Sequence, residues 1–120
     1  MAPIITREQL KAKMDRGDDF VLVEALSQNH YASSHLPGAI NLPYEFVDEA
    51  EKVLPDKTVE IVVYCMNTGC LASREEAREL EEMGYERVLH YAAGKQDWIR
   101  AGLSVEGWRG APRQRGNRLA

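Results

Sequence analysis

An apolar stretch near the middle of the chain constrains the fold more than any other feature. The segment Val59–Tyr64 reads VEIVVY and is rich in β-branched residues. Such near-continuous apolar character is typical of a strand that is buried on both faces. Strands of this kind occur inside parallel sheets whose two faces are covered by helices, so the stretch predicts an α/β fold.

Shorter segments on both sides of this strand fit the same fold. Apolar runs predict further strands at Phe20–Val23, Ala39–Leu42 and Arg87–Tyr91. Helices are predicted at Arg7–Asp15, at Glu45–Val53, after Cys70 up to Gly84, and at Lys95–Ala101. The alternation of strands and helices predicts a mostly parallel central sheet of about five strands with helices on both faces.

The size and charge of the chain indicate one domain with a basic end. A chain of 120 residues with 44% hydrophobic residues is long enough for a single core. We expect residues 1–106 to form that domain and residues 107–120, GWRGAPRQRGNRLA, to form a flexible tail. The tail carries four arginines and no acid, so the net charge of −4 leaves −8 on the remainder. An acidic body argues against nucleic acid as the main ligand.

Composition also bears on location and cofactors. No apolar run approaches the roughly 20 residues that cross a bilayer, so we expect a cytoplasmic protein that acts away from membranes. Two cysteines are too few for a disulfide scaffold, and we therefore expect reduced thiols. Their C-x4-C spacing is unlike the usual zinc pairs, and no residue pattern points to a metal or an organic cofactor. The oligomeric state is left open.

The buried strand leads directly into a candidate site. Cys65 follows the strand, and Cys70 lies five residues later, before a predicted helix. Ligands of open α/β sheets bind beyond the carboxyl ends of the strands. A short loop entering a helix can point its backbone N–H groups inward and favour a thiolate, which makes Cys65 a candidate nucleophile. From position alone, Cys65 is equally well explained as a small buried apolar group.

Four segments then resemble the single-domain rhodanese (sulfurtransferase) family, in order and with suitable spacing. They are His35–Pro43 (HLPGAINLP), Val62–Cys65 (VVYC), Gly84–Tyr85 (GY) and Gly94–Leu103 (GKQDWIRAGL). The resemblance covers the chain from Ile5 to about Glu106. It implies a rhodanese-like fold in which Cys65 takes a sulfane sulfur from a small donor as a persulfide. The outer sulfur would pass to a thiol, a cyanide-like acceptor or a sulfur-carrying protein.

The resemblance also implies how the persulfide is held, and the sequence departs from the family there. The anion would be bound by the backbone amides of the loop, which belong to Met66, Asn67, Thr68, Gly69 and Cys70. Many active members carry a cation in this loop, whereas the loop of this chain has none. A charged donor thereby loses a charge-assisted contact that contributes about 1.5–3 kcal/mol to binding. We therefore expect weak use of thiosulfate. Arg74 and Lys95 are candidate replacements for the missing cation, or else ordinary surface charges.

Other departures and roles remain open at this stage. Glu24-Ala25-Leu26 stands where the family often has Asp-Val-Arg, and Ala93-Gly94 stands where it has two glycines. Cys70 would either attack the Cys65 persulfide, take up the sulfur itself, or simply be a buried thiol that the loop keeps apart from Cys65. A sulfur-relay or thiol-redox module that works through a protein partner is the alternative function.

The remaining candidates carry weaker signals. A related phosphatase or arsenate reductase needs an arginine six residues after the cysteine, where Leu71 stands. Ser73 with Glu76 matches a capping box, which would begin the helix at Ser73 instead of near Cys70. His35 is expected to bond within its loop and His90 to pack in its strand.

Overall fold

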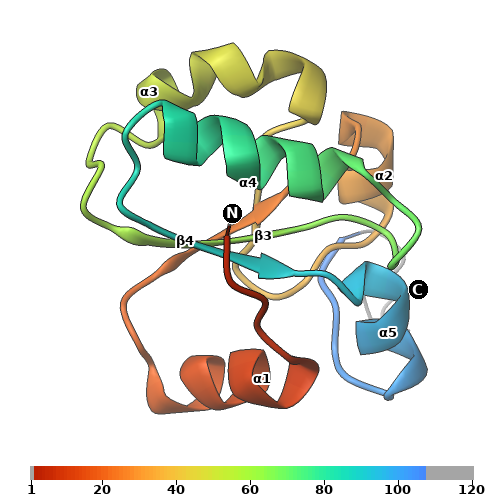
Figure 1. The fold of residues 1–120 in the computed structure, drawn as a ribbon. Coiled ribbons are helices and arrows are strands. Elements are labelled where there is room, and N and C mark those ends of the chain that lie inside the picture. The colour runs from red at the N-terminus through yellow and green to blue at the C-terminus, as the bar shows by residue number, and fades with distance from the viewer. Residues whose placement is uncertain (1, 108–120) are drawn as a thin grey trace.

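The fold is built on a single parallel sheet. The structure, a computed structural model, describes residues 2–107. Its strands are β1 (Val21–Glu24), β2 (Ile40–Asn41), β3 (Glu60–Tyr64) and β4 (Arg87–Tyr91), in the order β2-β1-β3-β4 (Figure 1). This α/β architecture confirms the expected fold class, with four strands instead of about five. The N-terminal segment comes closest to a fifth strand, but Ile4 forms only an isolated parallel bridge with His90.

Helices cover both faces of the sheet. They are α1 (Arg7–Arg16), α2 (Gln28–Ser33), the 3-10 helix η1 (Tyr44–Glu49), α3 (Ala50–Val53), α4 (Ala72–Glu82) and α5 (Gly94–Arg100). Figure 1 shows α1 and α5 below the sheet and α3 and α4 above it. The predicted helix Glu45–Val53 is split into η1 and α3. Within η1, Phe46 takes a non-helical conformation (φ −112°, ψ 19°). None of the helices within residues 2–107 is long and apolar enough to cross a membrane.

Local signals account for several helix ends. The capping box at the start of α1 is present, with the Gln9 amide donating to Thr6 Oγ1 and the Thr6 amide donating to Gln9 Oε1. Gly84, at φ 98°, follows the end of α4. Helix α4 begins at Ala72, so neither Cys70 nor Ser73 starts it. Ser73 therefore lies in the first turn.

The central strand is buried on both faces, as its sequence predicts. Ile61 and Val63 belong to the core cluster on the α4 side, and so does Cys65. Val62 and Tyr64 belong to the opposite cluster, which also contains Trp98. Because all four strands are parallel, the segments that follow β1, β3 and β4 meet at one edge, on the right of Figure 1.

The expected tail falls largely outside this description. Residues 108–120, with Trp108, lie outside the described residues, and the division of the chain at residue 106 stays a prediction. Glu106 itself is described and forms an antiparallel bridge with His35. The Gly38 amide also donates to Glu106 Oε1. The end of the described chain is thus attached beside the HLPG turn.

One carboxyl group lies in the core without a partner. Glu76 of α4 is fully buried, and neither carboxyl oxygen has a hydrogen-bond partner in the described structure. Burial, and to a lesser degree the nearby Glu45 carboxylate, raises the pKa of Glu76 to about 9. Glu76 is therefore neutral at pH 7 in the folded chain, whereas it is ionised in the unfolded chain.

This difference predicts a pH-dependent stability. The folded state keeps the Glu76 proton from pH 4.5 to about 9 while the unfolded state loses it, so the free energy of unfolding falls as the pH rises through that window. The slope is roughly 1.4 kcal/mol per pH unit. Glu76→Gln should flatten it in urea titrations between pH 5 and 8. Exposed Glu86→Gln is the control, and an unchanged slope in Glu76→Gln would contradict the assignment.

Candidate active site

The two cysteines are joined at the carboxyl edge of the sheet. Cys65 is 1% exposed and forms a disulfide with Cys70, with their Cα atoms 6.5 Å apart. That separation is within the range that a disulfide spans. The expectation of two reduced thiols, with Cys70 held apart as a buried thiol at the helix start, is therefore wrong for this form of the chain. The loop is short, but it turns back on itself.

Asn67 makes that turn. The Cys70 amide donates to the Asn67 carbonyl oxygen at 3.1 Å, and the Gly69 amide donates to Asn67 Oδ1 at 3.0 Å. Asparagine is common in turns because its side chain bonds to the backbone two residues on. In the disulfide form, two of the amides expected to hold a persulfide thus donate to Asn67. The anion-binding role of Met66, Asn67, Thr68, Gly69 and Cys70 stays a prediction.

Helix α5 holds the other side of the loop. The amides of Lys95 and Gln96 donate to the carbonyl oxygens of Cys65 and Met66, both at 2.8 Å. Gly94 makes this approach possible. It has φ 77°, and a Cβ atom there would lie 2.7 Å from the Met66 carbonyl group. Of the two positions that are glycine in the family, this chain keeps the glycine at 94, where the loop leaves no room for a side chain.

This contact predicts different costs for two glycine substitutions. Gly94→Ala and Gly102→Ala both place alanine at positive φ, but a Cβ at Gly102 would have no atom within 4 Å. Gly94→Ala should therefore lower the free energy of unfolding by at least about 2 kcal/mol more than Gly102→Ala, as measured by denaturant titration. Equal losses would show that the close approach is not a constraint.

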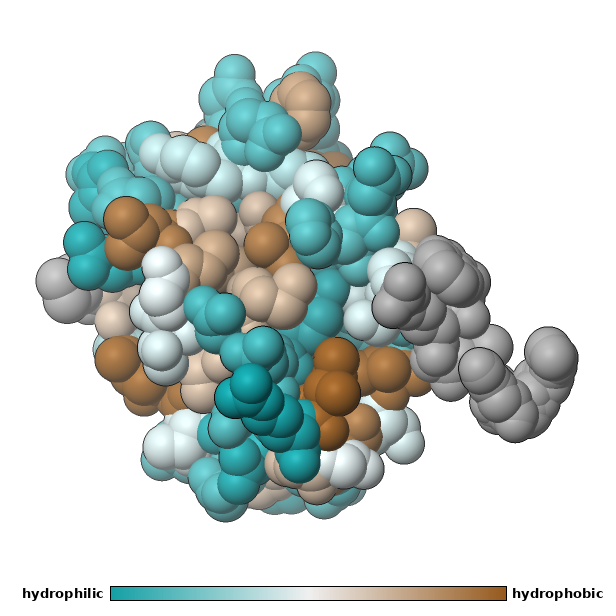
Figure 2. All heavy atoms as spheres, turned by 90° about the vertical axis from the view of Figure 1, so that its right-hand side faces the viewer, coloured by the Kyte–Doolittle hydropathy of each residue, from teal (hydrophilic) through white to brown (hydrophobic). Residues whose placement is uncertain are grey.

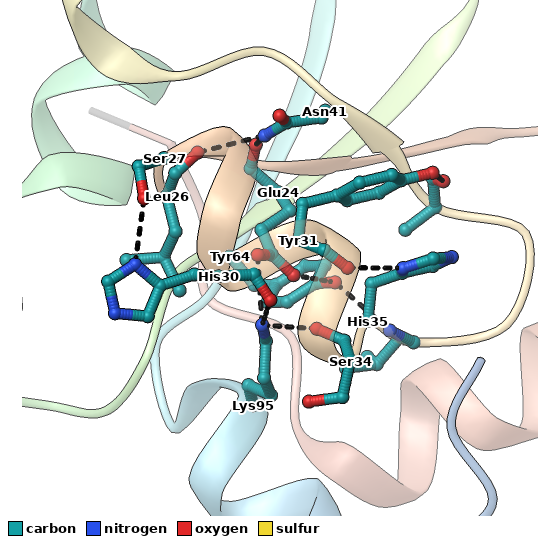
Figure 3. Close-up of polar contacts among 12 residues, drawn as sticks. Glu24, Leu26, Ser27, His30, Tyr31, Ser34, His35, Asn41, Tyr64 and Lys95 are labelled. Atoms are coloured by element: carbon teal, nitrogen blue, oxygen red, sulfur yellow. Dashed lines mark hydrogen bonds and ion pairs between the residues drawn. The ribbon is translucent and has the colours of Figure 1, made fainter. Parts of the chain in front are cut away.

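Lys95 is not the surface charge that the sequence suggested. It lies in α5 and is 2% exposed, and its ammonium group points toward Glu24 and Ser34 (Figure 3). Nζ donates to Glu24 Oε2 at 2.9 Å, to the His30 carbonyl at 3.1 Å and to the Ser34 carbonyl. These acceptors match the three donors of an ammonium group, so the buried charge is fully paired. Lys95 is therefore engaged elsewhere and does not act as the loop cation.

Glu24 extends this cluster across the edge of the sheet. Tyr64 donates its hydroxyl proton to Glu24 Oε1 at 2.7 Å and accepts the Leu36 amide at 3.1 Å. Burial, and then the neighbouring Glu24 carboxylate, raises the pKa of Tyr64. The Asn41 side chain donates to the carbonyl oxygens of Glu24 and Leu26. Glu24 thus keeps an acidic side chain at the first position of the segment that is Asp-Val-Arg in many family members. Sequence reasoning missed the pairing of Glu24 with Lys95, because the two residues are 71 positions apart.

The buried pair predicts non-additive mutational effects. Lys95→Met leaves Glu24 buried without its cation, so we expect a loss of about 3–5 kcal/mol of unfolding free energy. Glu24→Gln should cost a similar amount, and the double variant clearly less than the sum of both. Lys11→Met, in the exposed pair with Asp15, should stay within about 1 kcal/mol of the parent. Additive losses at Glu24 and Lys95 would contradict a coupled pair.

Two polar side chains line up behind the Cys65 sulfur. Ser73 Oγ lies 3.1 Å from Cys65 Sγ and 2.7 Å from His90 Nε2. Ser73 is 1% and His90 9% exposed. Burial, and then the charge of Arg74, lowers the pKa of His90. The expected packing of His90 in its strand is confirmed, but its bond to Ser73 had no sequence signal, because the residues lie on different elements.

A pocket adjoins the other cysteine. It has a volume of about 530 Å³ and lies between α4, β4 and the N-terminal segment, with Cys70, Arg74 and His90 in its wall. Arg74 lies in the first turn of α4 with 61% of its side chain exposed. Figure 2 shows the carboxyl edge face-on, with hydrophobic residues gathered in the middle among hydrophilic ones. Within residues 2–107, no group of three His, Cys, Asp or Glu side chains is arranged to hold a metal ion.

Comparison with known proteins gives consistent similarities. The model of the rhodanese-like domain matches residues 6–101. An HTH-type transcriptional regulator of Mycobacterium tuberculosis is 33% identical over 109 residues, which cover 90% of this chain and 46% of the regulator. The chain thus spans less than half of that relative. The thiosulfate sulfurtransferase GlpE of Haemophilus influenzae is 32% identical over 85% of this chain and 92% of its own length.

Solved structures share the fold. The rhodanese-like domain of the Alr3790 protein from Anabaena superposes with a TM-score of 0.80 at 25% identity, over 100% of this chain and 88% of that one. The BH2092 protein of Bacillus halodurans gives a TM-score of 0.84 at 23% identity, over 91% of this chain and 80% of its own.

Proposed function

The chain belongs to the rhodanese-like domain family, and from this membership we propose that it is a sulfurtransferase that carries a sulfane sulfur as a persulfide on Cys65. One observation carries the proposal. Cys65 follows the central buried strand β3 and opens a loop whose first two carbonyl groups accept the N-terminal amides of α5. The nucleophile therefore stands at the carboxyl edge of the sheet, where ligands of α/β folds bind.

The loop supplies the remaining chemistry in this proposal. A donor delivers its outer sulfur to the Cys65 thiolate, and the donor's leaving group takes the electron pair of the broken bond. In the reduced chain, the amides of the residues from Met66 to Cys70 are free to turn toward the persulfide anion once the disulfide is open. The acceptor, a thiol or cyanide, then attacks the outer sulfur and restores the Cys65 thiolate.

Weak use of thiosulfate is part of the proposal. The loop has no cation, and Lys95 is committed to Glu24, so Arg74 is the one left of the two candidate replacements. Its side chain is largely exposed, where an ion pair is worth roughly 1 kcal/mol or less. A dianionic donor is therefore bound less well here than in a loop with its own cation. Donors with less charge, such as a polysulfide or a protein persulfide, fit better.

A second function is favoured by the disulfide. In a sulfur-relay or thiol-redox module, the Cys70 thiolate attacks the inner sulfur of the Cys65 persulfide. The outer sulfur leaves as sulfide, and the Cys65–Cys70 disulfide forms, as the structure has it. In the transcriptional regulator that this chain resembles, the matching segment is 46% of a longer protein, which is consistent with a module that works beside another domain.

One experiment tests both functions. The reduced protein is treated with thiosulfate, with a polysulfide or with a protein persulfide, and its intact mass, its sulfur transfer to cyanide and its release of sulfide are measured. We expect one added sulfur atom, slower loading from thiosulfate, and loss of loading in Cys65→Ser. Loading that survives in Cys65→Ser would overturn the persulfide assignment. In Cys70→Ser, retained transfer supports the sulfurtransferase, whereas loss of sulfide release with retained loading supports the relay.

The same assay tests the missing cation. Thr68 is exposed in the loop, so Thr68→Lys adds a charge without disturbing the core. We expect loading from thiosulfate to rise about tenfold, with little change for the polysulfide. Thr68→Gln is the uncharged control. An equal rise for both donors, or none, would contradict the charge argument.

A further inference from the structure

The Cys65 sulfur is closed off from solvent, yet a line of polar atoms leads from it to the pocket. Cys65 is 1% exposed and Ser73, which contacts its sulfur, is also 1% exposed. The next group in the line is the His90 imidazole, at 2.7 Å from Ser73 Oγ. His90 is part of the pocket wall. The line therefore joins a buried nucleophile on β3 to an open space, through residues of α4 and β4.

We propose that Ser73 and His90 form a proton relay that carries the Cys65 thiol proton to the pocket and then holds the sulfur as a thiolate. The inference rests on the proposed function of Cys65 and assigns roles to two residues that the loop chemistry does not involve. Ser73 touches the reacting sulfur, and His90 is a positioning residue that acts through Ser73.

The relay conserves protons and moves no electrons between groups. In the thiol form, Cys65 S–H donates to Ser73 Oγ, and the Ser73 hydroxyl donates to His90 Nε2. Ser73 gives its proton to Nε2 as its oxygen takes the proton from sulfur, and the imidazolium then releases a proton from Nδ1 to water in the pocket. Afterwards Nε2–H donates to Ser73, and the Ser73 hydroxyl donates to the thiolate. His90 is neutral before and after, with its tautomer reversed.

The charges around His90 suit this cycle. Arg74, Glu75 and Arg78 of α4 share the pocket with His90, and Arg78 is paired with Glu75 and Glu82. The other elements beside His90 contribute Ile4 and Val63, which carry no charge. Burial and Arg74 lower the pKa of His90, so the imidazole rests in its neutral form at pH 7 and the imidazolium is only transient.

The same contact serves sulfur transfer. When an acceptor attacks the outer sulfur of the persulfide, the bond between the two sulfurs breaks and Cys65 Sγ leaves with its electron pair. A better stabilised thiolate leaves faster. The Ser73 hydroxyl, at 3.1 Å, is placed to donate to that sulfur.

The test measures the Cys65 thiolate without any sulfur donor. In Cys70→Ser, Cys65 is the only thiol, because the chain has two cysteines. Its rate of alkylation by iodoacetamide is followed by intact mass from pH 5 to 10. Adding Ser73→Ala or His90→Gln should lower the rate at pH 7 about tenfold and raise the midpoint of the profile by about one pH unit. Adding both should change no more than Ser73→Ala alone, because His90 acts through Ser73.

The controls separate this result from a structural effect. Ser27 and His30 form a matched pair on the surface, with Ser27 Oγ 2.8 Å from His30 Nδ1. Ser27→Ala and His30→Gln should leave the profile unchanged. Circular dichroism checks folding, and His90→Asn is a second variant if one of the others unfolds.

Two results would overturn the inference. One is an unchanged profile in folded Ser73→Ala and His90→Gln. The other is additive effects of the two substitutions, which would mean that each perturbs the site independently. Because no sulfur is transferred in the assay, a shifted profile in a protein that loads no sulfur would overturn the proposed function alone.

Discussion

The buried ion pair of Lys95 and Glu24 is the interaction on which the rest of the site depends. A charge removed from water must be paired and hydrogen-bonded in full, and the Lys95 ammonium meets this demand with three acceptors from β1 and the α2 region. The backbone of the same residue holds the Cys65 carbonyl. One residue thus fixes the start of α5, the end of β1 and the entrance of the cysteine loop relative to one another.

The parallel sheet gives the two cysteines different surroundings. Cys65 follows β3 into the core, where Ser73 contacts its sulfur and His90 contacts Ser73, while Cys70 reaches the pocket wall beside Arg74. A reagent that approaches through the pocket therefore meets Cys70 first. This difference in exposure suits the proposed site, in which the Cys65 sulfur carries the transferred sulfur and the Cys70 sulfur faces an incoming thiol.

The sequence predicts what depends on neighbours along the chain. The apolar run before Cys65 identifies the central strand, and Thr6 with Gln9 identifies the first turn of α1, because both patterns are local. The sequence does not reveal the burial of Lys95, because its partner Glu24 is distant in sequence and is brought close by the pairing of β1 with β3 and the contact of α5 with Cys65. The Ser73–His90 bond and the pairing of Cys65 with Cys70 likewise arise from tertiary contacts. The motif resemblance pointed to Cys65 and to the amides of its loop, but not to the Ser73–His90 bond or the disulfide.

The glycine at the start of α5 has a consequence for how this loop can diversify. Because Gly94 leaves no room against the backbone of Met66, the inner side of the loop is closed to new side chains. Thr68 and Gly69 are exposed on the outer side. Substitutions on the solvent face of the loop can thus be made without moving Cys65. The side of the loop that packs against α5 is fixed, and its solvent side is open to substitution.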